Sequence, residues 1–319
     1  MSTTASASQS PRHHRRRRGF RPAAIVLAVL ATAASLLLEA RAIARSELVF
    51  ESAYNYLVLE REGSVVRFRR MENGATVSAI DLADPRRQVI PYTGMLFGAA
   101  LVKGDPRHVL SVGLGAGALN RLFGSAYPDA RLTTVEIDPM ILEVARRHTG
   151  FQESAGDRVV LGDGRRYIAR STETWDWVVL DAFVRNSQVP FHLTTVEFYR
   201  LIAERLAPDG VLVTNLHYGG LLYESHLRTL REVFPQVVLF GGPATGNVIA
   251  AAVTYRAPNL LALIRGKDIA ALPDLKRWGV DFPALKHQAS DAAGMALSEE
   301  APLLTDDFAP VEYLDLKPR

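Results

Sequence analysis

The pattern of apolar and polar positions divides the chain into three parts. Short segments of alternating character run from residue 47 to residue 80, and the turn pairs Glu62-Gly63 and Asn73-Gly74 separate them. Such pairs are typical of hairpin turns, so we predict a small antiparallel β unit. From Arg86 to Leu101 the apolar residues recur at helical spacing, which predicts a helix connecting this unit to the rest of the chain.

After Asp105-Pro106, apolar strands alternate with amphipathic helices. We predict strands near residues 109–112, 132–136, 158–161, 176–181, 210–215, 235–240 and 247–254, with helices near 117–125, 139–148, 164–170, 194–206 and 221–233. This alternation requires a mostly parallel sheet with right-handed crossovers. The predicted fold class is therefore α/β.

Residues 1–46 form a separate segment. The run from Arg15 to Arg18 precedes an uncharged stretch from Pro22 to Leu38. At about seventeen residues, this stretch is at the short limit for spanning a bilayer, and it also fits the apolar part of a signal peptide. We expect membrane association through this segment, either as a retained anchor or as a signal, with the side of the membrane left open. Export is the alternative.

Composition excludes two classes of partner or site. The chain has 319 residues and a formal net charge of +3, but its first 21 residues contain six arginines and no acid, so the remainder is net negative. A footprint for nucleic acid should lie on the folded body, and we therefore expect no nucleic-acid partner. The chain contains no cysteine, which excludes disulfides and cysteine-ligated zinc.

The candidate chemistry lies at the junctions between strands and helices. The first four strands of the α/β part are followed in turn by a glycine turn with Gly113, Gly115 and Gly117, by Glu136, by Asp163 with Gly164, and by Asp181. Each acid alone could be a helix cap. Because ligands of parallel sheets bind at the carboxyl ends of the strands, the three acids beside a glycine turn predict one shared nucleoside site.

The span from about Glu51 to Leu216 resembles the spermidine synthase family of polyamine aminopropyltransferases. The resemblance is carried by those motifs in order, by Glu197-Phe198-Tyr199, and by the segment from Leu206 to Thr214. It implies an S-adenosylmethionine-dependent methyltransferase-type Rossmann sheet with a small N-terminal antiparallel β unit and an N-terminal hydrophobic segment. The implied domains are a disordered basic tail with a signal anchor or signal peptide (1–46), the β unit with its connecting helix (47–104), and a nucleoside-binding transferase domain (105–319).

The resemblance also implies a reaction and roles for residues. An aminopropyl group would pass from decarboxylated S-adenosylmethionine to putrescine or a similar amine, and methylthioadenosine would be released. Glu136 would hold the ribose, Asp163 the adenine, and Asp181 would orient or deprotonate the attacking amine. Gly113, Gly115, Gly117 and Gly164 complete the implied nucleoside-binding set.

Further expectations concern the acceptor, cofactors and assembly. Tyr92, His217 and Tyr218 are candidates to line the acceptor site. We expect no metal and no tightly bound cofactor, with decarboxylated S-adenosylmethionine or S-adenosylmethionine itself as co-substrate. Family members commonly form dimers, so a homodimer is one expected assembly. His192 borders the predicted site without a second ligand at metal spacing, and Arg165-Arg166 is expected to face solvent.

The departures from the family pattern fall on its amine-binding half. Ala116 stands where the glycine loop of the family usually carries an aspartate, and Val184 replaces the second acid of its Asp-x-x-Asp-Pro segment. Its Tyr-His-Glu appears here as Tyr92-Thr93-Gly94, and its Tyr-Gln as Tyr54-Asn55. We therefore expect an altered acceptor. Two alternatives stay open: a methyltransferase that uses ordinary S-adenosylmethionine, and a non-catalytic nucleoside-binding protein at the membrane.

Overall fold

The structure is a computed structural model that describes residues 45–183, 189–242 and 246–315. The chain from Ser46 onward forms one compact unit. Nearly all of the predicted N-terminal segment, including the stretch from Pro22 to Leu38, lies outside the described residues.

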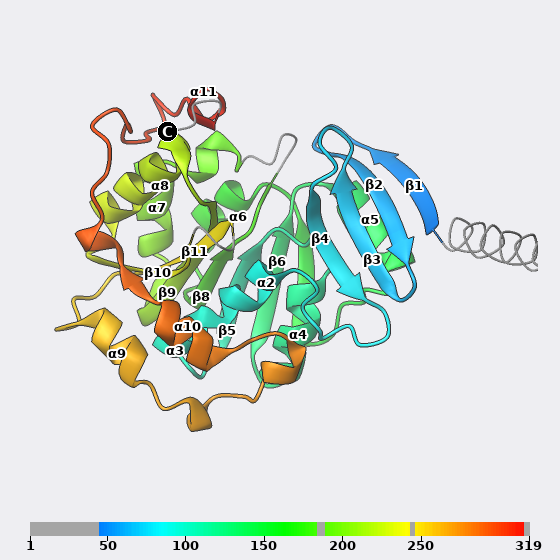
Figure 1. The fold of residues 1–319 in the computed structure, drawn as a ribbon, viewed down its shortest axis with the longest axis horizontal. Helices are drawn as coiled ribbons and strands as arrows, with labels where there is room; N and C mark the ends of the chain where they lie inside the picture. The colour runs from blue at the N-terminus through cyan, green and yellow to red at the C-terminus, as the bar shows by residue number, and fades with distance from the viewer. Residues whose placement is uncertain (1–44, 184–188, 243–245, 316–319) are drawn as a thin grey trace, which may run out of the picture. The chain divides into compact units, whose positions relative to one another are not determined.

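The predicted N-terminal β unit is a four-stranded sheet with the order β1-β2-β3-β4. Its strands are β1 (Arg45–Glu51), β2 (Tyr56–Glu62), β3 (Val65–Arg70) and β4 (Thr76–Asp81), coloured blue to cyan in Figure 1. β3 pairs antiparallel with both β2 and β4. Leu59, Phe68 and Ile80 are buried in a cluster that includes Leu114 and Ala116 of the glycine turn. The β unit therefore packs directly on the turn that carries the candidate site.

The connecting helix is shorter and more broken than the sequence pattern predicts. It consists of α2 (Pro91–Met95), a 3₁₀ turn η1 (Leu96–Gly98) and α3 (Ala99–Val102). The helix begins at Pro91 and not at Arg86. A proline is tolerated at the first helical position, where its missing N–H is not needed, and it keeps the residue before it extended. This segment places Tyr92 beside the candidate site.

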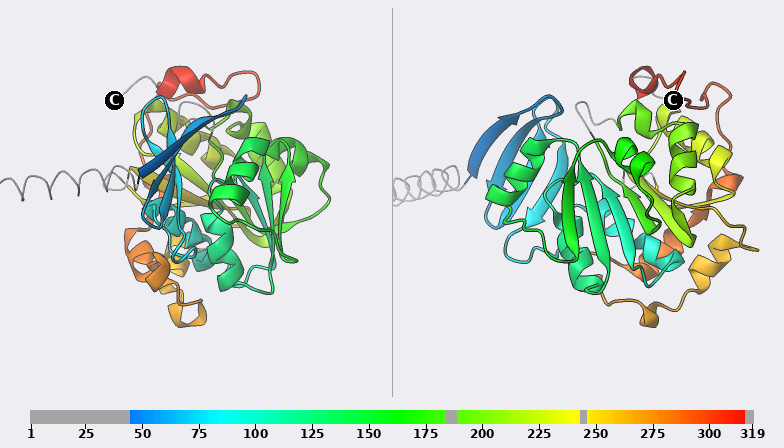
Figure 2. Two further views of the ribbon diagram at one scale, coloured as in Figure 1. Left: turned by 90° about the vertical axis from the view of Figure 1, so that its right-hand side faces the viewer. Right: turned by 180° about the vertical axis from the view of Figure 1, so that it is seen from behind.

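The main sheet has eight strands with the order β12-β10-β11-β9-β8-β5-β6-β7 (Figures 1 and 2). The strands are β5 (His108–Val112), β6 (Arg131–Glu136), β7 (Asp157–Leu161), β8 (Trp175–Leu180), β9 (Leu206–His217), β10 (Gln236–Gly241), β11 (Asn247–Val253) and β12 (Ser290–Asp291). The strands from β9 to β7 are parallel, whereas β11, β10 and β12 join by antiparallel pairing. The predicted α/β fold is confirmed.

The helices between these strands are α4 (Ala118–Ala126), α5 (Pro139–His148), α6 (Gly164–Arg170), the 3₁₀ turn η3 (Phe191–Leu193), α7 (Val196–Ala203) and α8 (Gly220–Val233). The C-terminal part contains α9 (Leu260–Gly266), η4 (Ile269–Ala271), η5 (Lys276–Trp278), α10 (Phe282–Gln288), η6 (Ala292–Gly294) and α11 (Val311–Asp315). Strand β9 begins four residues before the predicted start, and it carries Pro208 and Gly210 at an irregularity in its pairing with β8.

Alternating residues of the central strands fill two separate cores. Val109, Trp177 and Val211 belong to one cluster, and Leu110, Val178 and Leu212 to the other. Successive side chains of a strand point to opposite faces, so both faces of the sheet are covered. The parallel strands consequently present their carboxyl ends along one edge, where the predicted site residues follow them.

Candidate active site

The glycine turn after β5 lies close to strand β4 and to the segment that follows β8. Gly113 has a φ of 102°, and a Cβ atom there would lie 2.4 Å from the carbonyl oxygen of Asp181. Gly115 has a φ of 55°, and a Cβ there would lie 2.5 Å from the Oγ of Ser78. The same Oγ accepts a hydrogen bond from the N–H of Ala116 at 2.8 Å. Only glycine permits this conformation and these close approaches.

Glu136 ends β6 and is buried beside this turn. Its Oε2 accepts from the N–H of Leu114 and its Oε1 from the N–H of Asp138, both at 2.9 Å. Burial raises the pKa of Glu136 to about 7, although these hydrogen bonds act in the opposite direction. The two backbone donors fix the orientation of the carboxylate.

Asp163 caps α6 and also contacts a histidine. Its Oδ1 accepts from the N–H of Arg166 at 2.8 Å, which satisfies a backbone donor at the first turn of the helix. Its Oδ2 lies 2.7 Å from Nε2 of His192. The next residue, Gly164, leaves no room for a larger side chain, because a Cβ there would lie 2.5 Å from Cγ1 of Val112.

Asp181 follows β8 and is held by two side chains. Its Oδ1 accepts from Nδ2 of Asn215 at 2.9 Å, and its Oδ2 accepts from the hydroxyl of Tyr92 at 3.3 Å. Asn215 is itself fixed, because its Oδ1 accepts from Nδ2 of Asn247. Although Asp181 opens onto a cavity, desolvation by the surrounding protein raises its pKa to about 6. The buried phenol of Tyr92 has a pKa well above its usual value, through burial and the neighbouring carboxylate.

The predicted nucleoside-site residues lie around one cavity at the carboxyl ends of the strands. It is lined by Gly113, Gly115, Glu136, Asp163, Gly164 and Asp181 among others. Gly117, the residue before α4, has a φ of 77° and is not among the residues that line the cavity. Tyr92 reaches this set through its bond to Asp181.

The same cavity is lined by residues that the sequence reasoning missed. The guanidinium of Arg70 is buried there, and burial lowers its pKa to about 10. Asn55 and Ser78 also line it, together with His192, which the sequence pattern places at the border of the predicted site. Asn215 could have been found, because it lies near the carboxyl end of β9, where the strand-end rule applies. Arg70 comes from β3 of the other sheet, and nothing in the local pattern marks it.

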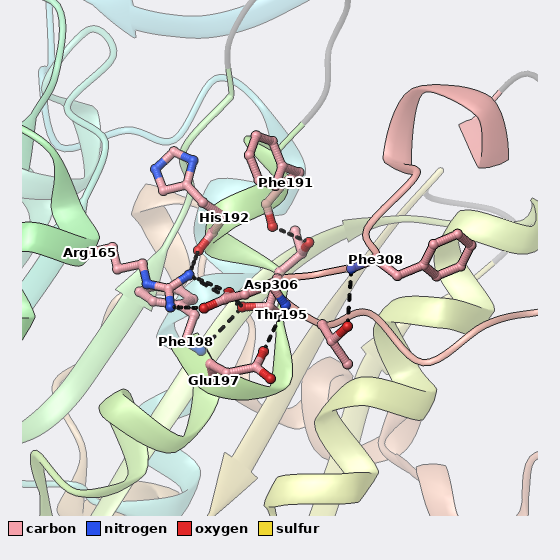
Figure 3. Close-up of polar contacts among 10 residues, drawn as sticks. Arg165, Phe191, His192, Thr195, Glu197, Phe198, Asp306 and Phe308 are labelled. Carbon is pink, nitrogen blue, oxygen red and sulfur yellow. Dashed lines mark hydrogen bonds and ion pairs between the residues drawn. The ribbon is translucent and has the colours of Figure 1, made fainter.

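The C-terminal segment fastens the loop that carries His192 (Figure 3). The guanidinium of Arg165 forms two parallel bonds to Asp306, at 2.7 and 2.5 Å, and donates to the carbonyl oxygen of His192 at 3.1 Å. Thr195 donates its hydroxyl to the same carboxylate, and the N–H of Asp306 donates to Glu197. The expectation that Arg165 faces solvent is therefore wrong: its side chain is only 24% exposed.

A second cavity adjoins the first. Phe183 lines both, and its ring stacks on His217 with centroids 5.1 Å apart and an interplanar angle of 10°. Of the two remaining acceptor candidates, His217 lines this second cavity, whereas Tyr218 lines neither and packs its half-exposed ring against Tyr223. Within the described ranges, no group of three or more His, Asp or Glu side chains is arranged to hold a metal ion.

Comparison with known proteins agrees with this geometry. Residues 90–240 match the spermine/spermidine synthase domain. A polyamine aminopropyltransferase from Vibrio vulnificus is 30% identical over 305 residues, which cover 92% of this chain and 98% of the relative. The chain belongs to the polyamine aminopropyltransferase family. Members of this family are transferases, and they move an aminopropyl group from decarboxylated S-adenosylmethionine.

Two solved structures share the fold. A probable spermidine synthase from Corynebacterium glutamicum has a TM-score of 0.60 and 23% identity, covering 69% of this chain and 86% of that chain. A spermidine synthase in complex with the transition state analogue AdoDATO has a TM-score of 0.54 and 20% identity, covering 66% of this chain and 74% of that chain. The predicted methyltransferase-type Rossmann sheet with a small N-terminal β unit is therefore correct.

The prediction of a membrane-associated localisation, with export as the alternative, is wrong. No helix among the described residues is long and apolar enough to cross a membrane. The Vibrio relative, which aligns with 92% of this chain, is named a polyamine aminopropyltransferase. The prediction came from the stretch between Pro22 and Leu38, which lies outside the described residues. At about seventeen apolar residues, that pattern was at the lower limit for a span.

Proposed function

We propose that this chain transfers an aminopropyl group from decarboxylated S-adenosylmethionine to an amine acceptor other than a diamine, with Asp181 as the proton-accepting group. The observation that carries the proposal is the position of Asp181: it opens onto the cavity of the glycine turn and is oriented by Asn215 and Tyr92. An oriented carboxylate at this edge of a Rossmann sheet can face both a nucleoside and a second substrate.

The donor binds through the strand-end acids. Glu136 accepts hydrogen bonds from the ribose hydroxyls, since its backbone donors leave lone pairs on both oxygens. Asp163 accepts from the adenine amino group through Oδ2. The glycine turn, with Gly113 and Gly115, lets the backbone approach the nucleoside closely.

The reaction is a displacement at carbon. The neutral amine nitrogen attacks the carbon bonded to the sulfonium, the new N–C bond forms as the C–S bond breaks, and sulfur keeps the electron pair as neutral methylthioadenosine. Asp181 aligns the amine and takes the proton that the new ammonium releases. With a pKa of about 6, Asp181 is ionised near neutral pH and is more basic than an ordinary aspartate.

The acceptor is altered because the carboxylates that would bind a diamine are missing. Ala116, Thr93 and Gly94 occupy positions where the family carries polar or acidic side chains. Arg70 adds a positive charge to the lining of the same cavity. An ammonium desolvated here without a partner would be costly.

We propose residues 47–104 and 105–319 as the division into β unit and transferase domain. The homodimer stays a prediction.

A second candidate function is the use of S-adenosylmethionine with its carboxylate retained, as in a methyltransferase. The observation that favours it is Arg70, whose guanidinium suits a carboxylate better than a lone ammonium tail. Ala116 also provides no acid for that tail.

Calorimetry on the full chain separates these functions. We expect methylthioadenosine to bind and decarboxylated S-adenosylmethionine to bind more tightly than S-adenosylmethionine. Mass spectrometry of reactions with an amine panel should then detect an aminopropylated product. Tighter binding of S-adenosylmethionine, together with a methylated product, would favour the second candidate. Binding of none of the three compounds would overturn both.

A further inference from the structure

The carboxylate of Asp138 lies two residues after Glu136 and is completely buried, although it caps a helix. Its Oδ1 accepts from the N–H of Met140 at 3.0 Å, in the first turn of α5. A capping aspartate at a protein surface leaves its second oxygen to water. Here the second oxygen, Oδ2, is enclosed. Protein donors must therefore satisfy it, because a buried carboxylate without hydrogen bonds is costly.

The donors to this oxygen come from the β unit, 86 and 83 residues earlier in the chain. The hydroxyl of Ser52 donates to Oδ2 of Asp138 at 2.6 Å, and Nδ2 of Asn55 donates to the same oxygen at 2.8 Å. Ser52 is held in turn, because its Oγ accepts from the N–H of Asn55 at 2.9 Å. Both residues belong to the turn between β1 and β2. We call Ser52, Asn55 and Asp138 together the turn clasp.

The turn clasp reaches Glu136 through the backbone. The N–H of Asp138 donates to Oε1 of Glu136 at 2.9 Å, and the N–H of Leu114 donates to Oε2. The position of Asp138 therefore fixes one of the two backbone donors that orient Glu136. Without its donors from the β unit, the carboxylate of Asp138 would turn toward water, and its N–H would move away from Glu136.

Apolar packing brings the two sides of the turn clasp together. Leu57 and Leu59 of β2 share a buried cluster with Ile141 and Leu142 of α5, the helix that Asp138 caps. Burial of apolar surface holds the β unit against this helix without specifying its exact position. Hydrogen bonds depend on distance and angle, so the clasp selects one position of the β1–β2 turn over the helix.

We propose that Ser52 and Asn55 are positioning residues for binding of the donor nucleoside. They hold Asp138, and the N–H of Asp138 keeps Glu136 in the orientation that binds the ribose hydroxyls. Docking of the β unit and binding of the ribose are thereby coupled, whereas Asp181 lies outside these contacts. The role rests on the proposed function, because Glu136 is the acid proposed to hold the ribose.

Two nucleosides test this role: methylthioadenosine and its 2′,3′-dideoxy analogue, which lacks the ribose hydroxyls. Calorimetry on the full chain gives both affinities for each variant. We expect Ser52→Ala and Asn55→Ala to bind methylthioadenosine about fivefold to tenfold more weakly than the native chain does. Both variants should bind the dideoxy analogue within about twofold of the native affinity. A change that only loosened the whole site would weaken both nucleosides equally.

Ser52 gives the sharper test, because Asn55 lines the cavity whereas Ser52 is not among its lining residues. Ser52→Thr keeps the hydroxyl and should restore the affinity for methylthioadenosine. Ser125→Ala removes an exposed serine hydroxyl from α4 and is the matched control, which should change neither affinity. In Asn55→Ala combined with Glu136→Gln, the loss should not exceed that of Glu136→Gln alone, since both changes remove the same interaction.

The outcomes separate the positioning role from the proposed function. Ser52→Ala weakening both nucleosides equally, or leaving both affinities unchanged, would reject the role. Losses that add in the double variant would mean that Asn55 contacts the nucleoside directly, and would also reject it. In these cases a loss specific to the ribose in Glu136→Gln alone would leave the proposed function intact. No such loss in Glu136→Gln would reject Glu136 as the ribose ligand, and the positioning role with it.

Discussion

The imidazole Nε2 of His192 lies 2.7 Å from Oδ2 of Asp163, and the other oxygen of that carboxylate caps α6. An adenine amino group that binds Asp163 must therefore share Oδ2 with His192. Arg165 holds the carbonyl oxygen of His192 and binds Asp306 near the C-terminus. The carboxylate proposed to bind adenine is thus connected to a segment about 140 residues further along the chain.

Asp163 should make the site selective for adenine over hypoxanthine. We expect methylthioadenosine to bind at least tenfold more tightly than methylthioinosine, because the carboxylate accepts from an amino group and repels a carbonyl oxygen. Asp163→Asn should reduce this ratio, since its amide can donate to the carbonyl and can still accept from the N–H of Arg166. Calorimetry with both nucleosides gives the ratio, and equal ratios in the two proteins would contradict the assignment.

Loss of Asp306 should weaken donor binding and leave the chemical step unchanged. In Asp306→Ala the loop around His192 loses its anchor on Arg165 and Thr195. We expect KM for the donor to rise about tenfold while kcat stays within about twofold. Asp307→Ala removes the adjacent exposed acid and serves as the control. A fall in kcat at unchanged KM would exclude a role in positioning the nucleoside site.

The raised pKa of Asp181 predicts the sign of its effect on stability. The pKa in the folded chain is about 6, above the ordinary value, so the folded state binds this proton more tightly than the unfolded state. Ionisation above about pH 6 then destabilises the fold, whereas below about pH 4 the group is protonated in both states. Asp181→Asn should therefore increase the free energy of unfolding at about pH 8, by up to about 3 kcal/mol.

Urea unfolding of native chain and Asp181→Asn across pH tests this sign. The difference should shrink as the pH falls through 6 and nearly vanish at about pH 4. A variant less stable than the native chain at about pH 8, by an amount independent of pH, would mean that its hydrogen bonds to Asn215 and Tyr92 outweigh its desolvation.

Glu136 should couple nucleoside binding to pH. Its pKa of about 7 means that the carboxylate proposed to accept ribose hydroxyls is fully formed only above that pH. We expect methylthioadenosine affinity to rise as the pH increases through 7 and then level off. Glu136→Gln should remove this dependence and weaken binding about tenfold. An unchanged pH profile in the variant would assign the titration to another group.

The sequence predicts the sheet and the nucleoside half of the site because both depend on local signals. Hydrophobic periodicity locates β5 to β8, and each strand end exposes its acid or glycine to the same edge. Other parts of the site are built differently. Arg70 comes from the small sheet, and Asp306, which holds the loop of His192 through Arg165, comes from the C-terminal segment. Nothing in the local pattern of these residues signals a site, because tertiary packing alone brings them there.

The broken connecting helix is a further feature that the local sequence pattern does not predict. Apolar spacing from Arg86 to Leu101 favours one helix, but Gly94 and Gly98 are positions of close packing in the structure. A Cβ at Gly94 would lie 2.3 Å from the carbonyl oxygen of Gly279, and one at Gly98 would lie 2.7 Å from the ring of Phe240. The contacts that require these glycines come from the distant C-terminal half.

The most direct test of the account is the turnover of decarboxylated S-adenosylmethionine by native chain and by Asp181→Asn, with methylthioadenosine and aminopropylated amine quantified together. The native chain should release the two products in equal amounts. Asp181→Asn should bind methylthioadenosine as the native chain does but turn over about 10² to 10⁴ times more slowly. Native-like turnover by Asp181→Asn, or methylthioadenosine released without an aminopropylated product, would contradict the assignment of this site.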